Sequence, residues 1–289
     1  MILVVGATGL LGGLIARMLL DGHRPVRILV REGSPFEELV LAGAEPVFGD
    51  VKDRASLRAA CRGVDAVVTT ANSSARGGAD TVESVDRVGN RDLVDAAEAE
   101  GVRRFVFVSA LGADPGHPVP FLRAKGETER RLRDSGMVWT VLRPNLYMEK
   151  LPVLVVGLPA LAGEPVTLVG EGRRVHTPIA VRDVAAFAVA ALERDECATL
   201  VLGGPQAVSW WDVVAAFARE LGRDVPVRTV PLEESLPGMP GFVAEVLRSL
   251  ETYDSPLDSS ALYAGYGVVA TSLAEFVHGF VVGSRQSAS

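Results

Sequence analysis

The stretch VVGATGLLGG at residues 4–13 decides the fold. Its glycines follow the spacing G-x-x-G-x-x-G, between an apolar run and a helix-length segment. A diphosphate can approach the main-chain N–H groups at a helix N-terminus only if no Cβ fills the tight turn, and the last glycine lets the helix pack closely on the strand. The stretch therefore predicts a dinucleotide-binding loop, whose cofactor-binding residues are Gly6, Thr8, Gly9, Leu10, Leu11 and Gly12.

Short apolar runs alternate with amphipathic, helix-length segments through the first half of the chain. The expected strands are Ile2–Val5, Val26–Val30, Glu45–Phe48, Ala66–Thr69, Phe105–Val108 and Trp139–Leu142. The expected helices are Leu10–Asp21, Pro35–Ala42, Ala55–Cys61, Val82–Glu100 and Arg123–Ser135. Near-continuous hydrophobic strands separated by helices imply a parallel sheet covered on both faces. We therefore predict an α/β fold, a doubly wound parallel Rossmann sheet with a smaller, mostly helical substrate-binding region.

The pattern becomes looser after Pro144, where glycine and proline are frequent. A helix Ile179–Leu192 and a strand Thr199–Leu202 are then expected to return to the sheet, and Trp210–Leu221 is a further helix. The predicted domains are residues 1–148 and 176–203 for the NAD(P)-binding core, and residues 149–175 and 204–289 for the substrate-binding or lid region.

Residues at the helix ends support these boundaries. Gly22, Gly101 and Gly136 each follow an expected helix, where a left-handed cap suits a residue without Cβ. Asp53 and Ser209 are the expected N-caps of two other helices.

The composition excludes several classes of protein. A formal charge of −7, from 29 basic and 36 acidic residues, argues against sequence-independent binding of nucleic acid. The two cysteines lack the spacing of a zinc site, so no metal is expected. The apolar stretch Leu151–Ala162 is far shorter than the ~20 residues that span a bilayer, and no basic leader precedes the first strand. We expect a cytoplasmic monomer or homodimer with no membrane partner.

The second expected strand ends on a basic residue. Rossmann domains that bind NAD usually carry an acidic residue about 20 positions after the glycine loop, where it holds the ribose hydroxyls. This chain has Arg31 there. A guanidinium can fork onto a 2′-phosphate, a contact worth roughly 1.5–3 kcal/mol. NADPH is therefore the expected cofactor, and NADH stays possible because Glu32 could serve its ribose.

Further cofactor contacts are expected where other strands end, because ligands of such sheets bind beyond the carboxyl ends of the strands. Asp50 and Val51 follow the third strand, and Asp50 either meets the adenine amino group or serves as a turn or N-cap residue. Thr70, Ala71 and Asn72 follow the fourth strand and should line the cofactor ribose.

These residues resemble the short-chain dehydrogenase/reductase superfamily, in particular its atypical, NmrA-like branch. The resemblance runs from residue 1 to roughly residue 235 and is carried by GATGLLGG, Arg31, Gly49-Asp50-Val51, Val85-Asp86…Gly89-Asn90, FVFVSALGA from Phe105, Lys125, Leu142-Arg143-Pro144-Asn145 and Thr177-Pro178-Ile179…Arg182-Asp183-Val184-Ala185. In active members of the superfamily, a Ser polarises the carbonyl, a Tyr delivers the proton, and a Lys four residues later lowers the tyrosine pKa and binds ribose. The resemblance implies that Ser109 and Lys125 take the first and last of these roles.

The chain departs from that pattern at the tyrosine. Phe121 stands four residues before Lys125, a spacing that puts both on one helix face, but it has no phenolic proton. A missing general acid typically costs about 10²–10⁴-fold in rate. Three explanations stay open. Lys125 could itself be the acid or the ribose clamp, as similar isoflavone-type reductases suggest; the substrate could carry its own acidifying group; or the fold could have kept nucleotide binding and lost catalysis.

Residues past the sixth strand complete the candidate site. Pro144 and Asn145 are expected on the nicotinamide side, and Tyr147 either supplies the missing proton or only lines the pocket wall. The two residues implied by the resemblance have plainer readings as well, since Ser109 could cap the turn after its strand and Lys125 could be a solvated helix residue.

Two apolar segments, Leu151–Ala162 and Leu236–Leu250, are expected to wall a hydrophobic pocket over the nicotinamide, and His176 is a further residue near the crevice. The expected function is NADPH-dependent reduction of a ketone or quinone carbonyl on a hydrophobic, aromatic or polyketide-like substrate. The alternative is a non-catalytic protein that senses the redox state of NADP(H), as the resemblance to NmrA-like proteins also allows.

Overall fold

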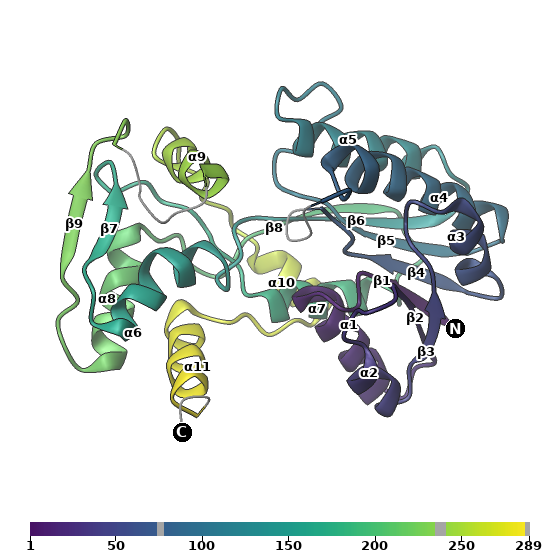
Figure 1. The fold of residues 1–289 in the computed structure, drawn as a ribbon, viewed down its shortest axis with the longest axis horizontal. Coiled ribbons are helices and arrows are strands. Elements are labelled where there is room, and N and C mark those ends of the chain that lie inside the picture. The colour runs from purple at the N-terminus through teal and green to yellow at the C-terminus, as the bar shows by residue number, and fades with distance from the viewer. Residues whose placement is uncertain (74–77, 235–240, 287–289) are drawn as a thin grey trace. The chain divides into compact units, whose positions relative to one another are not determined.

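Seven parallel strands form the central sheet of the protein (Figure 1); the computed structural model describes residues 1–73, 78–234 and 241–286. Their spatial order is β3-β2-β1-β4-β5-β6-β8, so the chain winds outward in opposite directions from β1 and β4. This confirms the predicted doubly wound sheet, and the predicted strands agree with the observed ones to within two residues at each end. The strands are β1 (Ile2–Val5), β2 (Val26–Val30), β3 (Glu45–Phe48), β4 (Ala66–Thr69), β5 (Arg104–Val108), β6 (Val138–Pro144) and β8 (Ala198–Leu202).

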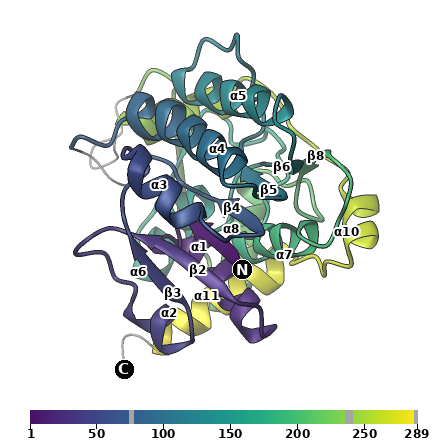
Figure 2. The same cartoon turned by 90° about the vertical axis from the view of Figure 1, so that its right-hand side faces the viewer.

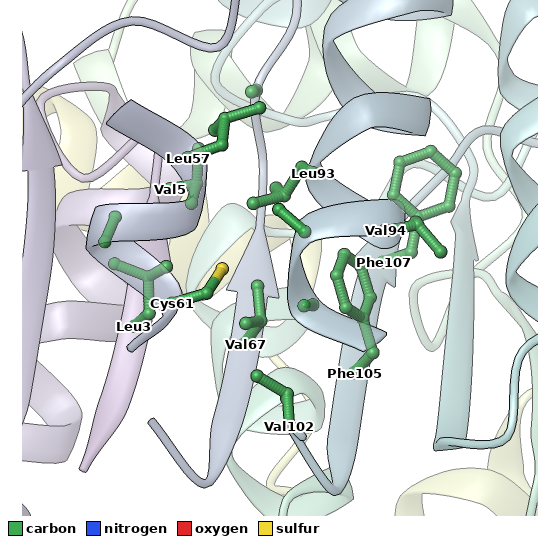
Figure 3. Packing of buried hydrophobic residues seen from close by; sticks show 14 of the residues in the cluster. Leu3, Val5, Leu57, Cys61, Val67, Leu93, Val94, Val102, Phe105 and Phe107 are labelled. Carbon is green, nitrogen blue, oxygen red and sulfur yellow. The ribbon is translucent and has the colours of Figure 1, made fainter. Parts of the chain in front are cut away.

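Helices cover both faces of this sheet (Figure 2). On one face lie α1 (Leu10–Asp21), α2 (Glu37–Leu41) and α7 (Val181–Ala191). On the other lie α3 (Arg54–Cys61), α4 (Asn90–Ala99) and α5 (Pro120–Arg133). The core between the sheet and α3 and α4 is apolar: Leu3, Val67 and Phe105 from the strands meet Leu57 and Leu93 from the helices (Figure 3). Burial of these side chains stabilises the sheet and so holds the ends of its strands in place.

The helix expected over Val82–Glu100 has two parts. It begins as a π-helical segment, η1 (Val82–Gly89), and continues as α4. The side-chain amide of Asn90 donates to the main-chain carbonyls of Val85 and Asp86, at 3.2 and 3.3 Å, inside this wider turn. A local change to π geometry is frequent at functional sites.

The helix caps were predicted with mixed success. Asp53 accepts a hydrogen bond from Ala55 N, and Gly101 adopts the left-handed conformation with φ 77°, as predicted. Gly22, by contrast, has φ −79°, because His23 takes the left-handed position with φ 55°. Helix α5 ends on Asp134 in the right-handed conformation, and not on Gly136. The prediction of left-handed caps at Gly22 and Gly136 is therefore wrong.

The chain divides into two compact units. The larger comprises residues 1–144, 182–202 and 264–268, and the smaller comprises residues 145–181, 203–263 and 269–289. These boundaries, at residues 144, 182 and 202, differ from the predicted ones at 148, 176 and 203, and the larger unit also includes the short segment 264–268.

The smaller unit is mostly helical, as predicted, but it also contains a two-stranded parallel sheet that the sequence did not reveal. Its apolar core includes Val156, Ala160, Phe217 and Val277, so part of the stretch Leu151–Ala162 is packed inside it. None of the helices in the described ranges has the length and apolar character that a membrane span needs. The elements are η2 (Val153–Gly157), α6 (Leu158–Ala162), β7 (Val166–Val169), α8 (Trp210–Leu221), β9 (Val227–Val230), α9 (Gly241–Leu250), α10 (Ser260–Tyr266, whose last turn joins the larger unit) and α11 (Leu273–Gln286).

Candidate functional site

The glycine loop joins β1 to α1 in a turn that tolerates no side chain at two positions. Gly6 has φ 88°, a left-handed conformation that favours glycine. A Cβ on Gly12 would lie 2.2 Å from the carbonyl oxygen of Gly6, so the first turn of α1 can approach the strand only with glycine there. Both residues are therefore required by the packing of the loop itself.

Gly9 is a different case, because the packing of the chain does not require glycine there. A Cβ on Gly9 would meet its nearest neighbour, Gly6 O, at an ordinary 3.4 Å. Gly9 is exposed, and so is Leu10, with 51% of its surface accessible. Within the described residues, no side chain caps the first turn of α1, and that turn contains no acidic residue. The N–H groups at this helix end are thus available to an external anion.

The residues that follow β4 contact the end of β1 and the glycine loop. Thr70 N donates to Val5 O at 2.9 Å, and the Thr70 hydroxyl lies 3.4 Å from Gly6 O. Asn72 donates to Thr70 O at 3.1 Å, which fixes the following turn. The predicted contacts of Thr70, Ala71 and Asn72 with ribose stay predictions, but their bonds place the carboxyl end of β4 beside the loop. An exposed, uncapped helix end behind glycines fits the diphosphate of a dinucleotide.

Arg31 lies in a charged cluster that consists of Arg31, Asp50, Lys52 and Asp80. Arg31 Nη1 contacts Asp80 Oδ2 at 2.7 Å and lies 3.9 Å from Asp50 Oδ2. Lys52 Nζ lies 3.4 Å from Asp50 Oδ2 and contacts Asp80 Oδ1. About a third of each cationic side chain is exposed, 39% for Arg31 and 32% for Lys52. Two accessible cations therefore stand at the ends of adjacent strands.

Lys52 and Asp80 were missed by sequence reasoning. The signal for Lys52 was present, because Val30 and Phe48 are neighbours in the β2–β3 register and the residues after these two strands must therefore meet. For Asp80, which precedes η1, the sequence carries no comparable signal. The side-chain hydrogen bond with Asp80 is the largest cause that raises the pKa of Lys52, so the amine keeps its charge.

Asp50 and Val51 both make structural contacts within the chain. The Asp50 carboxylate accepts a hydrogen bond from Lys52 N at 2.9 Å, which is the turn role that was the alternative to an adenine contact. The Val51 side chain is only 4% exposed and packs in the core against Gly89. The contact of Val51 with the cofactor stays a prediction.

Lys125 is buried between η1 and the strand ends, with 3% of its side chain exposed. Its Nζ lies 3.3 Å from Val108 O, 3.5 Å from Ala71 O and 3.7 Å from Asp86 Oδ1. The other Asp86 oxygen accepts bonds from the main-chain N–H and the hydroxyl of Ser73. Burial lowers the pKa of Lys125 and Asp86 opposes that change. The reading of Lys125 as a solvated helix residue is therefore wrong.

Phe121 stacks beside this amine, as the one-turn spacing predicts. Lys125 Nζ lies 5.4 Å from the centre of the Phe121 ring and 5.0 Å from that of Phe107. Such cation–π contacts stabilise a buried ammonium group. The position that holds a tyrosine in the resembled enzymes thus provides an aromatic face and no proton.

Ser109 is bound one turn further along α5, at Glu129. Its hydroxyl donates to Glu129 Oε1 at 2.6 Å, and both side chains are buried. Glu129 is also held by Arg143, at 2.6 Å, and by Arg133, at 2.7 Å. Polarisation of a substrate carbonyl by Ser109 would therefore require this bond to break, and the catalytic role of Ser109 stays a prediction.

Three further candidates belong to the smaller unit. The Asn145 amide donates to Thr177 Oγ1 at 3.2 Å and to Ser255 O at 3.1 Å, so it holds that unit together. His176 bonds Ser255 Oγ and Leu250 O through its two ring nitrogens, which indicates a structural residue. Burial raises the pKa of the Tyr147 phenol, as Glu149 does to a smaller extent, so Tyr147 holds its proton firmly.

Pro144, the last residue of β6, keeps its carbonyl bonded to Leu111 N at 3.1 Å. Contacts of Pro144 and Asn145 with the nicotinamide stay predictions. The segment expected over Leu236–Leu250 lies partly outside the described residues, and Met239 falls in that part. Among the residues that the structure describes, no cluster of His, Cys, Asp and Glu could hold a metal ion.

A doubly wound sheet with an open glycine loop after its first strand defines a Rossmann protein of the dinucleotide-binding class. Residues 6–195 match the NAD(P)H-binding family, and the chain belongs to this family. The match agrees with the resemblance to atypical short-chain dehydrogenases/reductases and confirms NAD(P)H as the cofactor class.

Several of the similar proteins are reductases, and others are photosystem II assembly factors, such as Ycf39 of Synechocystis, which is 32% identical over 236 residues, 80% of this chain and 71% of that one. NAD(P)H azoreductase of Xenophilus azovorans is 33% identical over 264 residues, which cover 89% of this chain and 88% of that protein. A (4-alkanoyl-5-oxo-2,5-dihydrofuran-3-yl)methyl phosphate reductase of Streptomyces griseus is 37% identical over 231 residues, 77% of this chain and 74% of that one. The crystal structure of an Escherichia coli NADPH-dependent quinone oxidoreductase with NADPH has a TM-score of 0.80 at 25% identity, covering 97% of this chain and 100% of that chain. The expected class of enzyme, an NAD(P)H-dependent oxidoreductase, is thereby confirmed.

Proposed function

We propose that this protein is an NADPH-dependent reductase of a quinone or ketone carbonyl on a hydrophobic, aromatic or polyketide-like substrate. The observation that carries the choice of cofactor is the pair of exposed cations, Arg31 and Lys52, beside an uncapped helix N-terminus. An arginine and a lysine at adjacent strand ends can both meet a 2′-phosphate, which NADH lacks.

The residues of the larger unit would hold the cofactor without supplying a proton. The N–H groups at the start of α1 would bind the diphosphate, and the charged cluster would bind the 2′-phosphate. When bound, NADPH supplies a hydride from C4 of its nicotinamide. Lys125 donates to the main-chain carbonyls of Ala71 and Val108, so it holds together the segments at the ends of β4 and β5. A 3% exposed amine engaged in this way is a positioning residue and not an accessible acid.

A substrate that needs no enzymic acid therefore suits this site. Hydride addition to a quinone gives a hydroquinone anion, which is stabilised by its ring and takes its proton from water. A ketone beside a phenol can use the phenol in the same way. The names of the related azoreductase and quinone oxidoreductase support acceptors of this kind, planar, conjugated and apolar. The smaller unit, which is distinct from the dinucleotide-binding sheet, is our candidate for substrate binding.

The test is an assay with NADPH and a panel of quinones, hydroxylated aromatic ketones and azo dyes, followed by the absorbance of the reduced cofactor. We expect consumption of NADPH with at least one quinone. The matched control is Gly9→Ala, in which the added methyl group fits the chain but obstructs the diphosphate. Consumption that is equal in wild type and control would show a reaction outside the site and refute the proposal.

Phe121 favours one alternative, a protein that binds NADP(H) and reports its redox state without catalysis. Its lack of a phenolic proton fits a fold that has kept nucleotide binding alone. Tight NADPH binding by the wild type with no consumption across the whole panel would favour this alternative.

A further inference from the structure

Asp80 bridges the two cations that the proposed function assigns to the 2′-phosphate. One carboxylate oxygen accepts from Arg31 Nη1 at 2.7 Å, and the other bonds Lys52 Nζ. The Asp80 side chain is 6% exposed, whereas the two cations are each about a third exposed. A carboxylate with one oxygen on each cation occupies the place that a phosphate would take between them.

Within the described residues, the two carboxylates Asp50 and Asp80 face the two cations Arg31 and Lys52. A phosphate that enters such a cluster is attracted by both cations and repelled by both carboxylates. Asp50 lies farther from each cation than Asp80 does, at 3.9 and 3.4 Å. Asp80 is therefore the carboxylate that competes most directly with an incoming anion.

The main chain around Asp80 is anchored on both sides. Ser84 Oγ donates to Ala79 O at 3.0 Å, and Thr81 and Ser84 form a reciprocal capping box at the start of η1. These bonds hold the main chain on both sides of Asp80, so we infer that its carboxylate leaves the cations by a movement of the side chain. Displacement of the carboxylate therefore does not require the helix to unwind.

We propose that the Asp80 carboxylate is a built-in competitor of the 2′-phosphate, and that NADPH binds by displacing it from Arg31 and Lys52. Asp80 is then a specificity-determining residue, since it lowers the affinity for NADPH and leaves NADH, which brings no phosphate to the cluster, unaffected. This inference rests on the cofactor assignment of the proposed function, and it is independent of the substrate.

The experiment measures binding by titration calorimetry, with adenosine 2′,5′-bisphosphate and adenosine 5′-monophosphate as probes that differ only in the 2′-phosphate. In Asp80→Asn we expect the affinity for the bisphosphate and for NADPH to rise about tenfold, the size of one charge-assisted contact. The affinity for the monophosphate and for NADH should stay within about twofold, well below that contact.

The matched control is Asp65→Asn, which removes the same charge at the amino ends of the strands, where Asp65 pairs with the N-terminal amine and Arg103. This variant should leave all four affinities unchanged. A second variant, Lys52→Met, should lower the affinity for the bisphosphate and leave the monophosphate unchanged. Thermal unfolding of each variant checks that it is folded.

An Asp80→Asn variant that binds the bisphosphate no better than wild type would overturn the inference. An unchanged selectivity in Lys52→Met would overturn it as well, even if Asp80→Asn were unfolded. These failures differ from failure of the proposed function, which appears as absence of NADPH consumption while binding and its response to Asp80→Asn are retained.

Discussion

Two regions at the carboxyl edge of the sheet handle their polar groups in opposite ways. After β1, β2 and β3, the helix N-terminus is uncapped and the cations Arg31 and Lys52 are exposed. Near the ends of β4 and β5, Lys125 and Ser109 are buried. Lys125 is paired with Asp86, and Ser109 is bonded to Glu129. The cations of the first region are paired with Asp80 but stay about a third exposed, whereas the polar groups of the second region are paired and buried.

This difference indicates how the catalytic work is divided. Under the proposed function, the exposed region would bind and orient the reduced dinucleotide, which suffices for hydride transfer to an acceptor that handles its own proton. The buried region supports the strand ends and supplies no free acid. Variants that act on only one of the two regions can break or sharpen this comparison.

The largest effect is expected at the glycine loop. In Gly12→Ala the new Cβ would stand 2.2 Å from a main-chain oxygen, so the loop and the start of α1 must move apart. We expect loss of NADPH and NADH binding by more than about 100-fold, together with roughly 1–3 kcal/mol of stability as for other overpacked sites. Calorimetric titration and urea unfolding measure the two effects.

Gly9→Ala separates cofactor binding from folding. Its Cβ meets only an ordinary contact at 3.4 Å, so the unfolding free energy should stay within about 1 kcal/mol of wild type while dinucleotide binding is lost. Retained binding in Gly9→Ala would contradict the proposed position of the diphosphate.

The next largest effect concerns stability and lies in the buried region. Asp86→Ala leaves the Lys125 ammonium buried without its carboxylate, which typically costs about 3–5 kcal/mol. The double variant Asp86→Ala/Lys125→Met, which has no unpaired charge, should recover much of this loss in urea unfolding. Equal stability of single and double variants would show that the pair is not the cause.

The pH dependence of that loss has a defined sign. Burial lowers the pKa of Lys125 in the folded protein below its ordinary value, so the folded state releases this proton at a lower pH than the unfolded state. Stability therefore rises with pH between the two pKa values, and the deficit of Asp86→Ala should shrink as the pH rises towards the ordinary pKa of lysine.

Much of the fold could be predicted because most strands are short apolar runs that alternate with amphipathic, helix-length segments. The glycine loop and Arg31 were predicted by their position after such runs. Strands β7 and β9 were not predicted, because they lie in the glycine- and proline-rich part of the chain, outside the alternation of strands with helices, and β9 is half exposed. Asp80 meets Arg31 only through tertiary structure, 49 residues away.

The bond of Ser109 with Glu129 is a second contact that could not be predicted from the sequence. Glu129 lies one turn after Lys125 on α5, so the sequence does place both on one helix face. Which strand-end residue meets this face depends on how α5 rotates against the sheet, and the apolar pattern does not determine that angle closely enough to distinguish a free serine from a paired one.

A smaller effect is expected for Ser109→Ala. Glu129 keeps Arg143 and Arg133, so the loss of stability should be about 1 kcal/mol and the loss of turnover less than about tenfold. Steady-state kinetics with the best quinone of the panel check this. A fall in turnover of about 100-fold or more would instead make Ser109 a catalytic residue.

The smallest effect is that of salt. Between about 0.1 M and 1 M salt the screening length falls from about 10 Å to about 3 Å, which weakens exposed charges far more than buried ones. The preference for NADPH over NADH should therefore shrink several-fold, whereas the stability deficit of Asp86→Ala should stay the same. An NADPH preference that is independent of salt would place the 2′-phosphate away from the exposed cluster.

The central claim is that the exposed region binds NADPH through its 2′-phosphate, and titration of wild type and Arg31→Ala with NADPH and NADH tests it most directly. We expect the wild type to bind NADPH more tightly, and Arg31→Ala to lose about 10- to 150-fold in affinity for NADPH with little change for NADH. Equal losses for both cofactors, or no binding of either by the wild type, would contradict the account.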